Sequence, residues 1–150
     1  MIIYTTNPEQ AKKEINKLNL QKEKPIIIKA QSLEFNRKLL EYGKFDMLLS
    51  IESTAKQSQF QKSLESGLNH VLAKIAAKNN IAIGIDLEEI RSLTKEQKAL
   101  SLAKIKQNIE ICRKAKTKIA LINIKDKKGA FSFLLSLGAS TKQAKQAITF

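Results

Sequence analysis

Short apolar runs alternate five times with longer segments that carry apolar residues at helical spacing. The apolar runs are rich in isoleucine and leucine and lie at residues 2–5, 25–30, 45–51, 81–86 and 118–124. The centres of two of them, Ile-Ile-Ile and Ile-Ala-Leu-Ile, are apolar without interruption, which is typical of strands buried on both faces. This repeated order of strand, crossover helix and strand predicts a parallel sheet with helices packed outside it.

Apolar stripes and capping residues place the helices between these strands. We predict helices at about 8–18, 32–43, 68–79, 95–115, 130–137 and 141–147. Asn7 and Ser32 are expected N-caps, and Gly43 is expected to end the second helix. Gly138 separates the last two helices, the second of which begins at Ser140 or Thr141.

The length of 150 residues limits how such a sheet closes. A full eight-unit barrel typically needs about 250 residues, with about 200 at the low end. Five strand–helix units cannot supply eight strands. We therefore expect one domain over residues 1–150, folded either as a truncated, incompletely closed barrel or as an open doubly wound sheet.

Composition excludes several classes of protein. A single cysteine, Cys112, excludes a disulfide framework, and a single histidine, His70, excludes a multi-histidine metal centre. Cys112 lies on an apolar stripe and is expected in the core. No apolar run approaches the roughly 18 residues of a membrane span, and the start of the chain lacks a signal-peptide pattern. Phosphate-binding glycine loops and nucleophile elbows are absent from the sequence. We expect no cofactor in the protein, no membrane association and a cytoplasmic location.

The charge is the most unusual part of the composition. Lysine and arginine number 27 against 14 acidic residues, which gives a net charge of +13. This excess predicts an anionic partner, with nucleic acid first and an acidic membrane surface second. Six phenylalanines, two tyrosines and no tryptophan argue against a base-stacking platform. We expect backbone contacts through basic side chains, including a group that starts at Lys104 and Lys106.

An alternative interpretation places chemistry at the carboxyl ends of the strands, where parallel α/β folds carry their sites. Lys29, Glu52 and Asp86 fall at such ends. A lysine beside carboxylates forms Schiff-base or acid–base sites, so these three residues fit a small-molecule lyase or hydrolase of α/β barrel type. Polar residues also occur at strand ends simply because those ends meet solvent.

One segment resembles a known family. Residues 66–86 read SGLNHVLAKIAAKNNIAIGID, and residues 133–140 read FLLSLGAS with Ala144 and Ala147 beyond them. Both stretches resemble archaeal ribonuclease P protein component 3, the homologue of the eukaryotic thirty-kilodalton ribonuclease P/MRP subunit. The resemblance is sharp over 66–86 and loose elsewhere, and it describes a shortened member of that family.

The resemblance implies a TIM-barrel-like parallel sheet with outer helices, truncated relative to a full barrel. It also implies a non-catalytic, RNA-binding subunit of the enzyme that removes 5′ leaders from precursor tRNA. In that enzyme the RNA subunit performs the cleavage with magnesium, and the protein pairs with component 2 and contacts precursor tRNA indirectly. Asn69 and Asp86 are expected to order the local turn and the strand end. Residues predicted to contact RNA are Lys62, His70, Lys74, Lys78, Arg91, Arg113 and Lys114.

Overall fold

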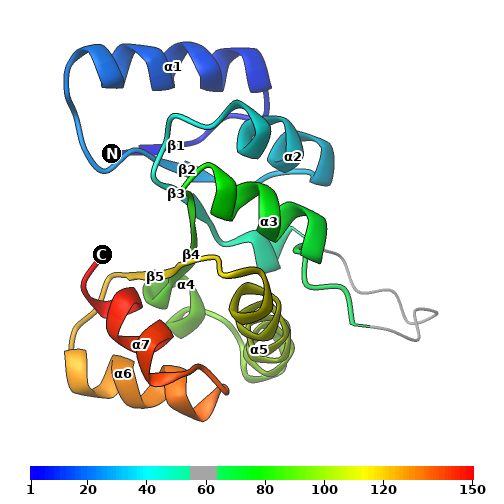
Figure 1. Cartoon of the computed structure of the whole chain (residues 1–150). Coiled ribbons are helices and arrows are strands. Elements are labelled where there is room, and N and C mark those ends of the chain that lie inside the picture. Colours follow the sequence, from blue (N-terminus) through cyan, green and yellow to red (C-terminus); the bar gives the residue numbers. More distant parts are fainter. Residues whose placement is uncertain (55–63) are drawn as a thin grey trace.

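A computed structural model describes residues 1–54 and 64–150. Within these residues, five parallel strands form one sheet in chain order (Figure 1). The strands are β1 (Ile2–Ile3), β2 (Ile27–Lys29), β3 (Met47–Leu49), β4 (Ala82–Asp86) and β5 (Ile119–Ile122). An unbroken chain order distinguishes this sheet from a doubly wound one, in which the order reverses at a switch point. The described parts of β1 and β5 do not pair, so the sheet has the order of a barrel without its closure.

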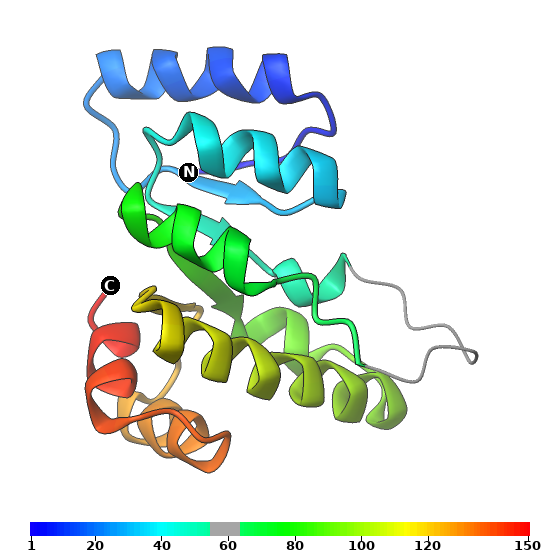
Figure 2. The same ribbon diagram turned by 45° about the vertical axis from the view of Figure 1, so that its right-hand side comes forward.

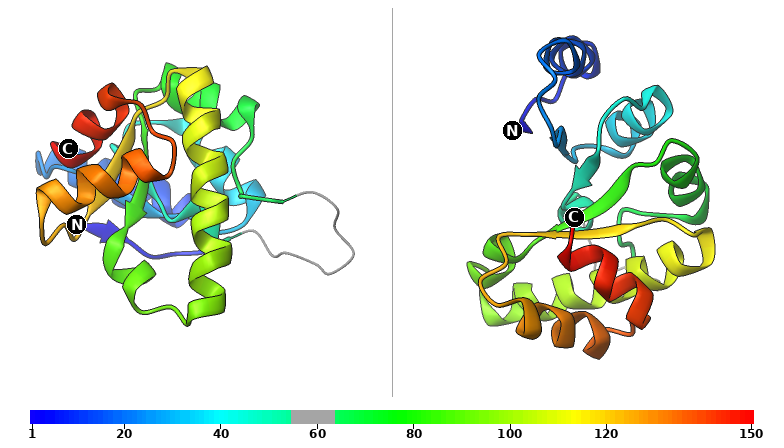
Figure 3. Two further views of the ribbon diagram at one scale, coloured as in Figure 1. Left: turned by 90° about the horizontal axis from the view of Figure 1, so that it is seen from below. Right: turned by 60° about the vertical axis from the view of Figure 1, so that its left-hand side comes forward.

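Helices connect the strands and cover the convex side of the curved sheet (Figure 3). The connecting helices are α1 (Pro8–Leu20), α2 (Leu33–Tyr42), α3 (His70–Lys78), α4 (Leu87–Arg91) and α5 (Lys95–Ala115), with a 3-10 helix η1 (Ile51–Ser53) after β3. After β5 come α6 (Lys127–Ser136) and α7 (Thr141–Ile148), and α7 packs against β5. The truncated, barrel-like fold predicted from the sequence is confirmed.

The two faces of the sheet are buried in different ways. Residues such as Ile28, Leu48 and Ile83 face the helices and belong to the main core. The alternate residues, among them Met47 and Leu49, form a separate small cluster on the concave face. Both faces are therefore apolar, which explains why the strands read as continuous apolar runs in the sequence.

Small residues line part of the concave face. A Cβ atom at Gly84 would overlap Sδ of Met47, so the methionine side chain lies directly over this glycine. The neighbouring concave positions Ala82 and Ala120 are also small and buried. Because larger side chains would crowd one another inside a tight arc, this alternation of large and small residues suits a strongly curved sheet.

Most helix ends follow the predicted capping residues. Asn7 Oδ1 accepts a hydrogen bond from Glu9 N at 3.0 Å, and Ser32 Oγ accepts one from Phe35 N at 3.1 Å. Gly43 ends α2 with φ +73°, a left-handed value that favours glycine. The capping predictions are confirmed.

Two helices differ from the expectation. α6 begins at Lys127 rather than at residue 130, because Asp126 accepts hydrogen bonds from the amides of Lys128 and Gly129. α4 was not predicted, since five residues are too few to show a helical period. In the described parts of the chain, no helix has the length and apolarity needed to cross a membrane.

Candidate functional site

The described contacts of the segment 66–86 are mainly structural. Gly67 has φ +81°, and a Cβ there would fall on the carbonyl oxygen of Ile51, so this loop packs tightly on η1. Asn69 Oδ1 accepts from Leu72 N at 2.9 Å and caps α3. Asn79 Nδ2 donates to Leu40 O at 2.6 Å and ties α3 to the end of α2. The part of the chain with the sharpest resemblance thus encodes packing and turns.

Asp86 orders the ends of two strands, as the sequence predicted. Its Oδ1 accepts from Glu88 N at 2.9 Å, which caps α4, and from Asn123 Nδ2 at 2.7 Å beyond β5. With these bonds the carboxylate of Asp86 serves the backbone and a neighbouring amide. It is therefore poorly suited to the acid–base role considered for it.

Lys29 and Glu52 belong to a cluster centred on Glu89. Lys29 Nζ lies 2.7 Å from Glu89 Oε2, and Ser50 Oγ donates to the same oxygen at 2.8 Å. Glu52 is buried, and this burial raises its pKa from 4.5 to about 7. The charge of Glu89 contributes to this rise in pKa, while a backbone hydrogen bond, Lys29 and Lys104 oppose it. Since the Lys29 amine is held by a carboxylate, it is a poor candidate nucleophile.

Lys104 departs from the expectation that it lies on the surface. It is only 5% exposed, on α5 beside a cavity of about 250 Å³ that Glu52 and Glu89 also line. Lys104, Asn108 and Cys112 are four residues apart and share the buried face of α5. That spacing was the available signal, but a lysine is assigned to the surface by default. Burial also raises the pKa of Cys112 to about 12, which keeps its thiol protonated.

The described residues predicted to contact RNA fall into two groups. His70, Lys74 and Lys78 form a stripe on the exposed side of α3, at positions i, i+4 and i+8. Arg113 and Lys114 lie in the last turn of α5, which packs beside α3 (Figure 2). These five residues therefore lie on two neighbouring helices.

Arg91 lies apart from these two helices, on α4 at the carboxyl end of β4. Arg113 also has a structural contact, because its Nη1 donates to Gly138 O at 2.8 Å. Lys114 lies 3.3 Å from Glu110 one turn earlier on α5. Lys62 lies outside the described residues.

The loops that enter the strands add basic residues; the sequence grouped Lys116 and Lys118 with the long helix but did not connect them with the other loops. These exposed lysines, from three loops, are Lys22, Lys24, Lys44, Lys116 and Lys118. In a parallel sheet all entering loops meet at the amino-terminal edge, where the last turns of α3 and α5 also end. The two acids in those loops are Glu23 and Asp46. Asp46 forms an ion pair with Lys24 at 3.4 Å and accepts a hydrogen bond from Ile26 N at 2.6 Å. The amino-terminal edge is thus a basic surface suited to phosphate groups.

Three archaeal proteins are similar to this chain, and each is named ribonuclease P protein component 3. The protein of Methanosarcina mazei is 37% identical over 89 residues, which is 59% of this chain and 34% of the relative. That of Methanosarcina acetivorans is 34% identical over 64% of this chain and 36% of the relative. The resemblance to component 3 is confirmed. A third match, from Methanothermobacter thermautotrophicus, is 25% identical over 76% of this chain.

These component 3 relatives are longer than the part that matches. The aligned region spans between 34% and 43% of their length. No protein-family model matches the chain.

Solved structures show the same fold. A chain in the cryo-EM structure of archaeal ribonuclease P with mature tRNA superposes with a TM-score of 0.77 and 21% identity. The match covers 99% of this chain and 63% of that one. A crystal structure of an uncharacterized protein matches with a TM-score of 0.63 and 10% identity, over 94% of this chain and 36% of the other. The five-stranded arrangement therefore corresponds to part of the fold of larger chains.

Proposed function

We propose that this chain is a non-catalytic, RNA-binding subunit of ribonuclease P that assists removal of 5′ leaders from precursor tRNA. The observation that carries the proposal is the similarity of more than half of the chain to proteins named ribonuclease P protein component 3. The net charge of +13 supports it, because a surplus of this size favours a polyanionic partner. Residues 1–150 act as one domain in this proposal, in the cytoplasm.

The proposed RNA surface comprises the exposed side of α3, the end of α5 and the amino-terminal edge. Lys74 and Lys78 on α3 are exposed, as are Lys116 and Lys118 at the edge. Such side chains neutralise phosphates and displace counterions, so binding is expected to weaken steeply as salt rises. The catalytic RNA, with its magnesium, performs the cleavage. Component 2 is the proposed protein partner, and precursor tRNA is contacted indirectly.

Reconstitution tests this function. The cognate ribonuclease P RNA and component 2 are combined with and without the chain, and cleavage of precursor tRNA and affinity for the RNA are measured. We expect the chain to increase leader removal at low magnesium and to raise RNA affinity. If neither quantity changes, the proposed function is wrong.

A matched pair of double variants locates the surface. Lys74→Gln with Lys78→Gln removes two charges from α3, and Lys142→Gln with Lys145→Gln removes two exposed charges from α7. We expect the α3 variant to lower the salt slope of RNA binding by about two units, at about one unit per lost phosphate contact. The α7 variant is expected to leave the slope unchanged. Equal slopes for the two variants would contradict a surface on α3.

The small-molecule alternative has one observation in its favour, the cavity of about 250 Å³ beside Glu52 and Glu89. It requires a reactive Lys29, yet that amine is bound to Glu89. Lys29→Ala discriminates between the two functions. An RNA-binding subunit is expected to keep its effect on precursor-tRNA cleavage when this variant folds.

A further inference from the structure

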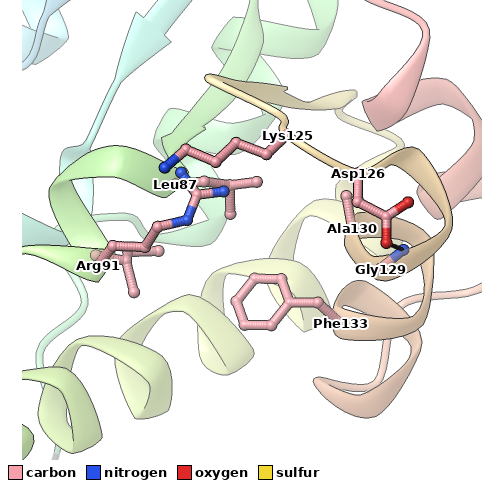
Figure 4. A pocket seen from close by; sticks show the side chains of 8 residues that line it. Leu87, Arg91, Lys125, Asp126, Gly129, Ala130 and Phe133 are labelled. Carbon is pink, nitrogen blue, oxygen red and sulfur yellow. Dashed lines mark hydrogen bonds between the residues drawn. The ribbon is translucent and has the colours of Figure 1, made fainter.

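A second cavity, between α4 and α6, combines apolar walls, one aromatic ring and two cations (Figure 4). Its volume is about 330 Å³, at the lower end of the range for small-molecule sites. Leu87 and Ile90 line it from α4, and Ala130 and Phe133 from α6. It opens at the carboxyl ends of β4 and β5, on the opposite edge of the sheet from the entering loops.

The two cations converge on a single carboxylate at the rim. Arg91 Nη1 donates to Glu88 Oε2 at 3.1 Å and to Asn123 O at 3.3 Å. Lys125 Nζ lies 3.9 Å from the same Glu88 oxygen. Both cations share this one carboxylate, and Lys125, at the longer distance and with an exposed side chain, is the more loosely held.

The fourth charged group, Asp126, keeps its negative charge but lies at the start of α6, across the cavity from the two cations (Figure 4). Its two carboxylate oxygens accept from Lys128 N at 3.1 Å and from Gly129 N at 3.2 Å, where they cap α6. The amino terminus of α6 is thus satisfied by the chain itself. The recognition capacity of the cavity lies in the ring of Phe133, the apolar walls and the Arg91–Lys125 pair.

We infer that this cavity binds one unstacked nucleotide of an RNA strand. The inference rests on the proposed function. Arg91 was already predicted to contact RNA, and the inference adds the site in which that contact would occur. The base would lie against the ring of Phe133, since unpaired bases are commonly held on aromatic side chains. Its phosphate would meet Arg91 and Lys125, where the guanidinium and the amine lie together on the α4 side of the cavity (Figure 4).

Charge favours this occupant over an apolar partner side chain. The other cavity at this edge is lined by two acids and one lysine, whereas the Phe133 cavity is lined by two cations and one acid, beside an aromatic ring. An apolar group would fill the walls but would make no use of the two cations on the α4 side. A nucleotide satisfies both, because it has a flat apolar face and an anionic backbone.

Phe133→Leu tests the ring without removing the apolar wall. The matched control is Phe131→Leu, the same substitution on the same helix at a half-buried ring that does not line the cavity. Affinity of each full-length variant for ribonuclease P RNA is measured against salt concentration, and thermal unfolding verifies that both fold. We expect Phe133→Leu to weaken binding by about fivefold to tenfold with an unchanged salt slope, because stacking carries no counterion release. Phe131→Leu is expected to bind as the parent chain does.

Photo-crosslinking gives an independent readout. Ribonuclease P RNA containing 4-thiouridine is irradiated with the parent chain, and crosslinked peptides are mapped by mass spectrometry. We expect a crosslink in the peptide that contains Phe133, and its loss in Phe133→Leu. If the two phenylalanine variants bind equally and no crosslink maps to this peptide, the nucleotide site is wrong while the proposed function stands.

Two further outcomes have distinct meanings. If Phe133→Leu weakens binding of component 2 and leaves RNA affinity intact, the cavity takes a protein side chain, and the nucleotide inference is overturned. If the parent chain neither binds ribonuclease P RNA nor stimulates cleavage, the proposed function itself fails, and this inference fails with it.

Discussion

The two edges of the sheet differ in whether their charged side chains are paired or exposed. At the carboxyl-terminal edge, cations and carboxylates engage one another, as in the Lys29–Glu89 pair at 2.7 Å and the Arg91–Glu88 pair at 3.1 Å. At the amino-terminal edge, Lys116 and Lys118 are exposed, and neither has an ion pair among the residues that the structure describes. One edge is therefore a polar network with cavities, and the other leaves several lysines exposed.

Part of this difference follows from helix electrostatics. The helices α1, α2, α3 and α5 start near the carboxyl-terminal edge of the sheet and end near the amino-terminal edge. Acids favour helix starts, as at Glu9, Glu34 and Glu96, and cations favour helix ends, as at Lys78 and Lys114. The parallel topology aligns these local preferences, so a moderate bias in each unit adds up to one basic edge. The basic surface of this chain therefore arises from topology as well as from composition.

The close packing of the carboxyl-terminal edge is tested by a pair of glycine substitutions. Gly67 and Gly138 both have positive φ, but a Cβ at Gly67 would meet Ile51 O, whereas a Cβ at Gly138 meets nothing within 4 Å. We expect Gly67→Ala to lower the free energy of unfolding by about 4 kcal/mol and Gly138→Ala by about 1 kcal/mol. Chemical denaturation measures both. Equal losses would show that the loop on η1 is not tightly packed.

The buried carboxyl of Glu52 makes stability at the same edge depend on pH. Its pKa is about 7 in the folded protein against 4.5 for the free group, so the folded state holds its proton more tightly. The stabilisation from that proton is complete below pH 4.5 and is lost as pH rises through 7. Glu52→Gln keeps a neutral side chain at every pH. We expect it to unfold like the parent near pH 4 and to be more stable by about 3 kcal/mol above pH 8.

Denaturation curves of both proteins at several pH values provide the measurement for Glu52. The difference between them reports chiefly on this group, because the substitution removes its titration. A difference that stays constant from pH 4 to pH 8 would show that the folded pKa is close to the ordinary one.

The function of the amino-terminal edge is tested by removing three positive charges from it and, in a control, three from the opposite edge. Lys44→Gln, Lys116→Gln and Lys118→Gln remove three cations from entering loops. The control removes three from the opposite edge, at Lys95, Lys98 and Lys127. We expect the first variant to lose about a hundredfold in RNA affinity near 0.1 M salt and two to three units of salt slope. The control is expected to lose much less, and equal losses would mean that RNA binding does not distinguish the edges.

Much of the architecture was predictable because its signals are local. Uninterrupted apolar runs indicated strands buried on both faces, and Asn7 and Ser32 marked helix starts through hydrogen bonds that span only two or three residues. The sequence predicted only that the sheet is too short to close into a full barrel, because 150 residues cannot supply eight strands. The chain order of the strands, which distinguishes a barrel-like sheet from a doubly wound one, is a long-range property that no local pattern contains.

The candidate surfaces were less predictable for the same reason. Lys44 and Lys116 are far apart in sequence and meet only because parallel strands bring their loops to one edge. Lys104 was misplaced although its spacing marked the buried face of α5, because a buried lysine needs acidic neighbours, and Glu52 and Glu89 come from other elements. The cavity near Phe133 requires α4, which the sequence did not predict, so a single aromatic ring in α6 gave no signal of a site.

The smallest expected effect concerns the tie between α3 and α2, near the amino-terminal edge. Asn79 Nδ2 donates to Leu40 O at 2.6 Å, and Asn79 also ends α3, next to the exposed Lys78. Asn79→Ala leaves that carbonyl without its side-chain donor and is expected to cost about 1–2 kcal/mol of stability. RNA affinity below the unfolding transition is expected to fall less than threefold, because no charge is removed. A larger loss of affinity at unchanged stability would show that Asn79 itself contacts RNA, and the basic edge would then extend along the α3–β4 loop.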